Sequence, residues 1–99
     1  MSKFYVMGNY TPKALQGFIK NPSQDRAAAA SELSKTIGAT LASFDIVRGQ
    51  YDFIAAVDAP NFESTAALKM VVVASGNIEN LTILEAVDMK NIALLASTA

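Results

Sequence analysis

The stretch GQYD at residues 49–52 places a glycine, a phenol and a carboxylate between two apolar segments. In a structural interpretation, Gly49 makes a turn, the Tyr51 ring packs with its hydroxyl at an edge, and Asp52 accepts hydrogen bonds from the backbone or from Arg48. In a functional interpretation, Tyr51 and Asp52 lie at the rim of a pocket between subunits and bind a small polar ligand. Catalysis by Tyr51 would need strong activation, because a tyrosine has a reference pKa of about 10.

Three further polar residues stand within apolar runs, namely Asn9, Asp45 and Glu85. Each can lie at a strand edge or end, or in a local hydrogen bond. If several converge on one covered face of a sheet, they form a polar cavity in apolar surroundings, as in many ligand pockets. They therefore join Tyr51 and Asp52 as ligand-binding candidates, whereas the sequence singles out no catalytic residue.

The composition excludes several kinds of catalytic and metal site. The chain has no cysteine and no histidine, so thiolate or imidazole catalysis and the corresponding metal sites are excluded within it. No carboxylate pattern indicates a metal site, and no glycine-rich phosphate fingerprint is present. We therefore predict neither a metal nor a cofactor.

Charge and hydropathy limit the partners and the location. The net charge is −1, and no basic stripe indicates nucleic-acid binding. The longest apolar runs, such as MVVVA at 70–74, are far shorter than the roughly 18 residues that span a membrane. The N-terminus lacks the apolar core of a signal peptide, so a cytoplasmic location is expected.

The pattern along the chain predicts alternating strands and helices. In the strand from Tyr51, alternation places Tyr51 with Phe53, and Asp52 with Ile54 on the other face. The strands around Gly49-Gln50 are joined by a two-residue type II′ turn. A helix is expected to begin at Asn21 and Pro22 and to end at Gly38. The remaining predictions are strands at 3–10, 40–48, 51–59 and 80–88, and helical segments at 12–20, 61–75 and 89–97.

This order predicts an α+β protein, a ferredoxin-like βαββαβ domain with an antiparallel four-stranded sheet. The domain covers residues 1–88, and residues 89–99 form a C-terminal helical tail. The chain is 52% apolar and only 17% charged, and both faces of the 51–59 strand are largely apolar. A second sheet is expected to cover the face without helices, giving a homo-oligomer of the dimeric α/β barrel type.

The sequence resembles the GYD family, whose Gly-x-Tyr-Asp motif stands here as Gly49, Tyr51 and Asp52. The resemblance runs through YTPKALQGFIKNPS at 10–23, GATLASFDIVRGQYDFIAAVDAP at 38–60 and ASGNIENLTILEA at 74–86, and it leaves the tail helix unexplained. It implies a plan similar to dimeric α/β barrel proteins, which include cofactor-free monooxygenases, isomerases and ligand-sensing domains of regulators. It names a scaffold and no reaction.

The expected function is that of an oligomeric small-molecule-binding module. One alternative is a cofactor-independent enzyme of the oxygenase or isomerase type, and another is a purely structural or interaction subunit. A buried cavity faced by Tyr51 and Asp52 would favour binding or catalysis, whereas a barrel filled by side chains would favour the structural role.

Overall fold

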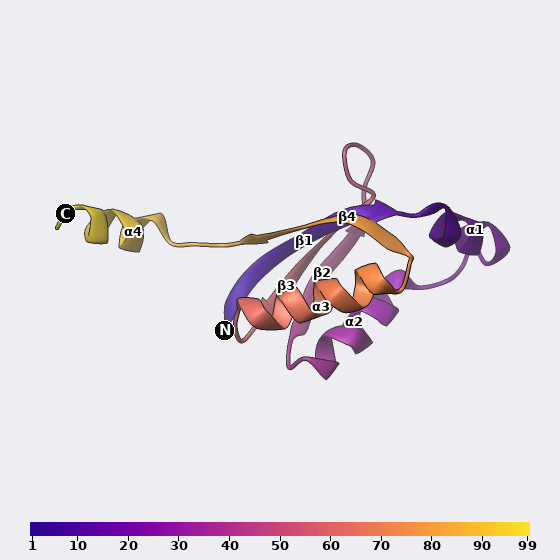
Figure 1. The fold of residues 1–99 in the computed structure, drawn as a ribbon, viewed down its shortest axis with the longest axis horizontal. Coiled ribbons are helices and arrows are strands. Elements are labelled where there is room, and N and C mark those ends of the chain that lie inside the picture. The colour runs from indigo at the N-terminus through magenta and orange to yellow at the C-terminus, as the bar shows by residue number, and fades with distance from the viewer.

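The computed structural model describes all residues, 1–99 (Figure 1). In chain order its elements are β1 (Ser2–Tyr10), α1 (Pro12–Lys20), α2 (Arg26–Thr36), β2 (Thr40–Ile46), β3 (Phe53–Ala59), α3 (Phe62–Ala74), β4 (Ile78–Glu85) and α4 (Met89–Ala96). None of the helices is long and apolar enough to cross a membrane.

The strands form one antiparallel sheet in the order β2-β3-β1-β4. Helices α2 and α3 both lie against the same face of this sheet, below it in the view of Figure 1. The predicted ferredoxin-like α+β fold with an additional C-terminal helix is therefore confirmed.

The core lies between the sheet and these helices. Alternate residues of β1 and β3 point into it, among them Phe4, Val6 and Val57, which are at most 5% exposed. Gly8 continues this face of β1 without a side chain. A Cβ there would lie 3.1 Å from Leu81 Cδ1 and 3.3 Å from the Glu79 carbonyl oxygen, so β4 can approach only a glycine.

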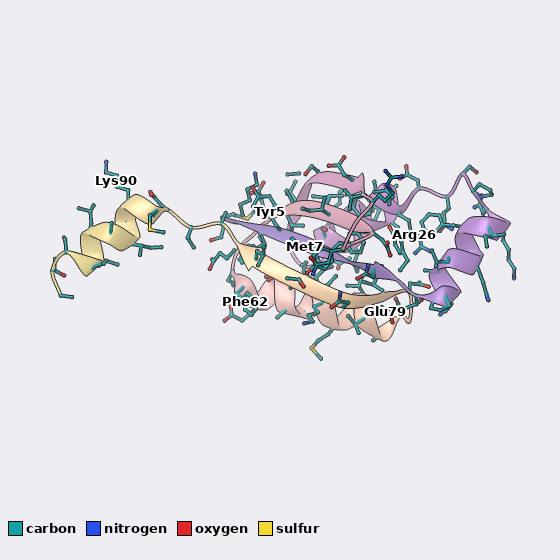
Figure 2. The ribbon with its side chains drawn as sticks, turned by 90° about the horizontal axis from the view of Figure 1, so that it is seen from above. Tyr5, Met7, Arg26, Phe62, Glu79 and Lys90 are labelled. Atoms are coloured by element: carbon teal, nitrogen blue, oxygen red, sulfur yellow. The ribbon has the colours of Figure 1, made fainter.

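The other sheet face carries no helix. Tyr5 and Met7 of β1, labelled in Figure 2, lie there beside residues of β3 and β4. Their register partners include Ala56, Ile54 and Leu84, and Leu84 is 52% exposed. This open face is therefore largely apolar and no helix covers it in the single chain, although Met7 and Ala56 are only 8% and 5% exposed there.

The predicted start of the helix that ends near Gly38 was wrong. Asn21 does not begin α2; it ends α1, and its backbone N–H donates to the Gly17 carbonyl. The helix starts four positions later because Asp25 is its N-cap and accepts from the Ala28 N–H at 3.0 Å. Pro22 therefore lies in the connection between α1 and α2.

The predicted two-residue turn at Gly49-Gln50 was also wrong. The Val47 N–H donates to the Asp52 carbonyl at 2.8 Å and closes a longer loop, which projects above the sheet in Figure 1. The hairpin ends early because Asp52 turns to β1, donating its N–H to the Gly8 carbonyl at 2.9 Å. The last strand likewise ends at Glu85, before the predicted 88, and it contains an irregularity at Asn80, whose φ is 54°.

Helix α4 stands apart from the body of the protein (Figure 1). All its residues are exposed, including Leu95 at 74%. The radius of gyration is 15.5 Å, whereas about 13 Å is typical for this length. The accessible surface is 6398 Å², about 1,000 Å² more than a compact monomer of this mass exposes.

Candidate functional site

A cavity of about 210 Å³ lies between the covered face of the sheet and helices α2 and α3. Of its 19 lining residues 15 are hydrophobic. The space exists because alanines stand where larger side chains would fill it, notably Ala55 on the sheet and Ala29 and Ala30 on α2. The other apolar walls come from Val6, Leu33, Leu41, Phe44, Phe53, Val57, Leu68, Val71, Val72, Ile78 and Leu81.

Two polar side chains of this cavity hold buried atoms without a hydrogen-bond partner. These atoms are the hydroxyl oxygen of Tyr10, a residue only 7% exposed, and Nε of Arg26. Buried polar groups are nearly always paired, and leaving one unpaired costs about 1–3 kcal/mol. This cavity is therefore the place where the fold leaves hydrogen-bonding capacity unused.

Tyr10 is held firmly at the end of β1. Its ring packs edge-on against Phe18 with centroids 5.1 Å apart, and against Phe53 at 5.6 Å. Its backbone N–H donates to Asp52 Oδ2 at 2.8 Å. Phe44 extends this aromatic row, since it stacks on Phe53 with an interplanar angle of 7°.

Arg26 is positioned as the first residue of α2, directly after the Asp25 cap. Its Cζ lies 4.9 Å from the ring centroid of Phe18 and 5.6 Å from that of Tyr10. Figure 2 shows Arg26 at the end of the sheet nearest α1. Arg26 forms no ion pair, because the single salt bridge of the chain joins Lys35 to Glu32.

Burial raises the pKa of the Tyr10 hydroxyl above its ordinary value; the nearby Arg26 charge lowers it and Asp52 raises it. The phenol therefore stays protonated at neutral pH. In this state it can donate a hydrogen bond, but it cannot serve as a base.

A second, more open depression of about 350 Å³ lies beside the cavity. Phe18 and Ile46 are among its walls, with Ser23 and Gln24 from the connection before α2. Arg26 and Phe44 line both hollows and therefore form the partition between them.

Two of the sequence-predicted site residues meet on the open face of the sheet. The Tyr51 hydroxyl lies 3.1 Å from Thr82 Oγ1, and Thr82 is the register partner of Met7 on that face. The prediction that Tyr51 shares the face of Phe53 was therefore wrong, because the regular alternation of β3 begins only at Phe53. Asn9 joins the same region, donating to the Gln50 carbonyl at 3.2 Å and accepting from Asn80 at 2.9 Å.

The other three predicted residues do not converge with these. The Asp52 carboxylate is engaged by the Tyr10 N–H at the edge between β1 and β3. Asp45 is exposed on β2 opposite Ile54, and Glu85 is exposed near the end of β4 opposite Phe4. None of the five lines the cavity.

Sequence reasoning missed Tyr10 and Arg26 as site residues, although a signal for Arg26 was present. Arg26, Ala30 and Leu33 recur at helical spacing, so the arginine falls on the same face of α2 as the apolar residues. A charged residue within an apolar helix face needs a partner in the space that the face covers.

Strand order and helix placement define the molecule as a ferredoxin-like α+β protein. The chain belongs to the GYD family, since the sequence model of the GYD domain matches residues 4–96. The matched range includes all of α4, which the sequence resemblance had left unexplained. No curated protein matches the chain in sequence.

Solved structures share the fold at low identity. FFRP-DM1 is 12% identical, with a TM-score of 0.59 over 88% of this chain and 100% of that one. TTHA0845 from Thermus thermophilus is 19% identical, with a TM-score of 0.58 over 89% of this chain and 95% of that one. An AsnC family transcriptional regulator from Agrobacterium tumefaciens is 14% identical, with a TM-score of 0.53 over 88% of this chain and 50% of that one. These similarities show the fold alone.

Proposed function

We propose that this GYD protein is a homo-oligomeric module that binds a small, largely apolar molecule in the cavity beneath α2 and α3. The observation that carries the proposal is the Tyr10 hydroxyl, which is buried beside an apolar cavity and has no partner within the chain. A ligand with one acceptor group would pair it, while its apolar part would fill the space between the alanines and the aromatic row.

Binding is better supported than catalysis by the cavity's own residues. Besides the Tyr10 hydroxyl, its polar lining consists of Arg26, Ser34, Ser75 and Asn77, and it includes no carboxylate. Because burial raises the pKa of Tyr10, the cavity lacks a ready general base at neutral pH. The structural-subunit alternative predicts instead that the cavity takes up no molecule.

Self-association is supported by the surface of the chain. The surplus of about 1,000 Å² of exposed area is close to the roughly 800 Å² that each partner buries in a standard interface. Two surfaces are available, the open sheet face around Tyr5 and Leu84 and the exposed residues of α4. We propose that the sheet faces of two copies pair and that α4 packs on a second copy.

Ligand binding can be tested with toluene and benzoate as probes, measured by calorimetry and by the rise in melting temperature. A matched pair of variants on α2 isolates the cavity. Ala30→Leu puts three extra carbon atoms into the space, whereas Ala28→Leu makes the same change at an exposed position outside it. We expect at least one probe to bind the wild type and Ala28→Leu, with at least tenfold weaker binding to Ala30→Leu. Failure of both probes to bind at millimolar concentration would contradict the proposal.

Self-association has a separate test. Sedimentation at micromolar concentration should give a species at least twice the 10.5 kDa of the chain. A stable monomer under these conditions would overturn the oligomer proposal and leave the ligand-binding proposal unaffected.

A further inference from the structure

We infer that the ligand of this cavity is a small carboxylate with an apolar body, whose acid group is bound by Arg26 and Tyr10. This inference rests on the proposed binding function and adds the chemical class of the ligand. It follows from the charge of Arg26, from the two unpaired donors and from the size of the cavity.

The guanidinium of Arg26 forms no ion pair with a carboxylate of the chain. The carboxylates of Asp25, its neighbour in sequence, and of Asp52, which bonds the backbone of Tyr10, keep their charges but are hydrogen-bonded to backbone N–H groups. Arg26 also stands at the first position of α2, where the helix dipole adds a positive potential. An anion beside Arg26 would be stabilised both by the guanidinium charge and by the positive end of the helix dipole.

The two unpaired atoms are both donors in the protonation states that the structure favours. Arg26 Nε carries a hydrogen, and the Tyr10 hydroxyl remains protonated because burial raises its pKa. Arg26 lies over the Tyr10 ring, with Cζ 5.6 Å from its centroid. A carboxylate has two acceptor oxygens and can satisfy both groups, whereas a ligand that carries only donors or a positive charge would satisfy neither.

Flat apolar surroundings hold the Arg26 guanidinium in place. Phe18 packs under it with its ring centroid 4.9 Å from Cζ, and Gly17 of α1 lies beside it, since a Cβ there would stand in van der Waals contact with Nη2 at 3.9 Å. The group is therefore stacked on one side and can offer its donors at the partition between the cavity and the outer depression.

The volume limits the body of the ligand. An engineered apolar cavity of roughly 150 Å³ binds benzene, and drug-sized ligands occupy about 300–1,000 Å³. A cavity of about 210 Å³ thus suits a single ring or a short branched chain that bears one acid group. Phe44, Phe53 and Leu33 would contact that body.

The test compares benzoate, its neutral analogue of the same shape, benzamide, and the smaller apolar toluene, by calorimetry at pH 7 and low salt. We expect the wild type to bind benzoate at least tenfold more tightly than benzamide, and this preference to shrink in high salt. Arg26→Gln should abolish the preference and leave toluene binding within about twofold. The matched control is Arg48→Gln, which changes the other arginine of the chain, an exposed one, and should leave all three affinities unchanged.

Tyr10→Phe should weaken benzoate binding about five- to twentyfold without lowering the melting temperature, because the lost hydroxyl has no partner in the free protein. Should Arg26→Gln fold poorly, Arg26→Lys retains the charge, and we expect it to keep part of the preference for benzoate. Equal binding of benzoate, benzamide and toluene would overturn the carboxylate assignment but leave the binding function standing. Benzoate binding that survives in Arg26→Gln would also overturn it. Failure of every probe to bind would instead reject the proposed function itself.

Discussion

The carboxylate of Asp52 accepts a hydrogen bond of 2.8 Å from the backbone N–H of Tyr10. Asp52 is the last residue of the Gly-x-Tyr-Asp motif, and Tyr10 carries the unpaired hydroxyl of the cavity. The motif therefore reaches the cavity indirectly, by fixing the end of the strand that holds the tyrosine.

Replacing Asp52 tests this connection. Asp52→Ala leaves the partly buried Tyr10 N–H without its acceptor, so we expect a loss of about 1–3 kcal/mol in the free energy of unfolding. Probe binding should weaken as well, because Tyr10 loses its anchor. The control is Asp45→Ala, an exposed carboxylate with no side-chain hydrogen bond on a neighbouring strand, which should change stability by less than about 0.5 kcal/mol. Denaturant titration of both variants measures the free energy of unfolding. An equal loss in Asp52→Ala and Asp45→Ala would contradict the role of Asp52 in anchoring Tyr10.

Tyr51→Phe is expected to act on the open face alone. It removes the 3.1 Å hydrogen bond to Thr82, which should lower the free energy of unfolding by about 0.5–1.5 kcal/mol. Affinity for a cavity probe should stay unchanged, since Tyr51 does not line the cavity. A variant that keeps its melting temperature but loses ligand affinity would instead support a ligand-binding role for Tyr51.

The glycine of the motif should matter through its backbone. Gly49 has a φ of 150°, and a Cβ there would meet nothing within 4 Å. Gly49→Val should therefore destabilise by about 1–3 kcal/mol from conformational strain without any clash. Gly17→Ala, inside α1 where φ is ordinary, should be neutral or mildly stabilising in the same thermal melts. If both changes have the same effect, strain at Gly49 is not the reason for the glycine.

The buried phenol gives stability a dependence on alkaline pH. Burial raises the pKa of Tyr10 in the folded state above the value of about 10 that holds in the unfolded chain. The unfolded state therefore releases this proton first. The contribution of the protonated Tyr10 to the free energy of unfolding is constant below about pH 10. It is lost as the pH rises from there through the pKa that Tyr10 has in the folded state. Urea unfolding between pH 8 and 11 should show this decline, and in Tyr10→Phe the decline should be smaller.

Deleting residues 89–99 should weaken assembly and leave the single chain intact. Because α4 is fully exposed, its loss removes no packing from the sheet and the other helices. We expect a smaller species in sedimentation, and a melting temperature lower than that of the wild type. Lys90→Ala, a change in the polar part of α4, serves as the control. Unchanged assembly and melting temperature after the deletion would contradict packing of α4 on a second copy.

The sequence was sufficient for the fold, because the alternation in β1 and β3 and the caps of α3 act locally. The helical segment predicted at 61–75 is observed as α3, and its Asn61 cap accepts from the Ser64 N–H. The start of α2 was missed because Asn21 and Asp25 are both good capping residues, and α1 uses the first of them at its own end.

The cavity was beyond sequence reasoning for a different reason. Its polar atoms, from Tyr10 and Arg26, meet only when α2 packs beside the end of β1. The pattern around Gly49, Tyr51 and Asp52 drew attention to the hairpin itself, whereas the long-range bond from Asp52 to Tyr10 depends on strand pairing. The alanines that leave the space are also small residues of the kind that permit close packing, so the pattern alone cannot separate a void from a contact.

The cavity also gives the protein a response to hydrostatic pressure. Unfolding eliminates internal voids, so the unfolded chain occupies less volume, by an amount that scales with the space lost and is of the order of tens of mL/mol. The dry part of a space of about 210 Å³ adds to this loss of volume, so the free protein should unfold at a lower pressure than the protein with its cavity filled. A molecule that fills this space reduces the volume that unfolding would eliminate. Occupancy of the cavity can therefore be followed as a rise in the unfolding pressure, without a label and without knowing the ligand.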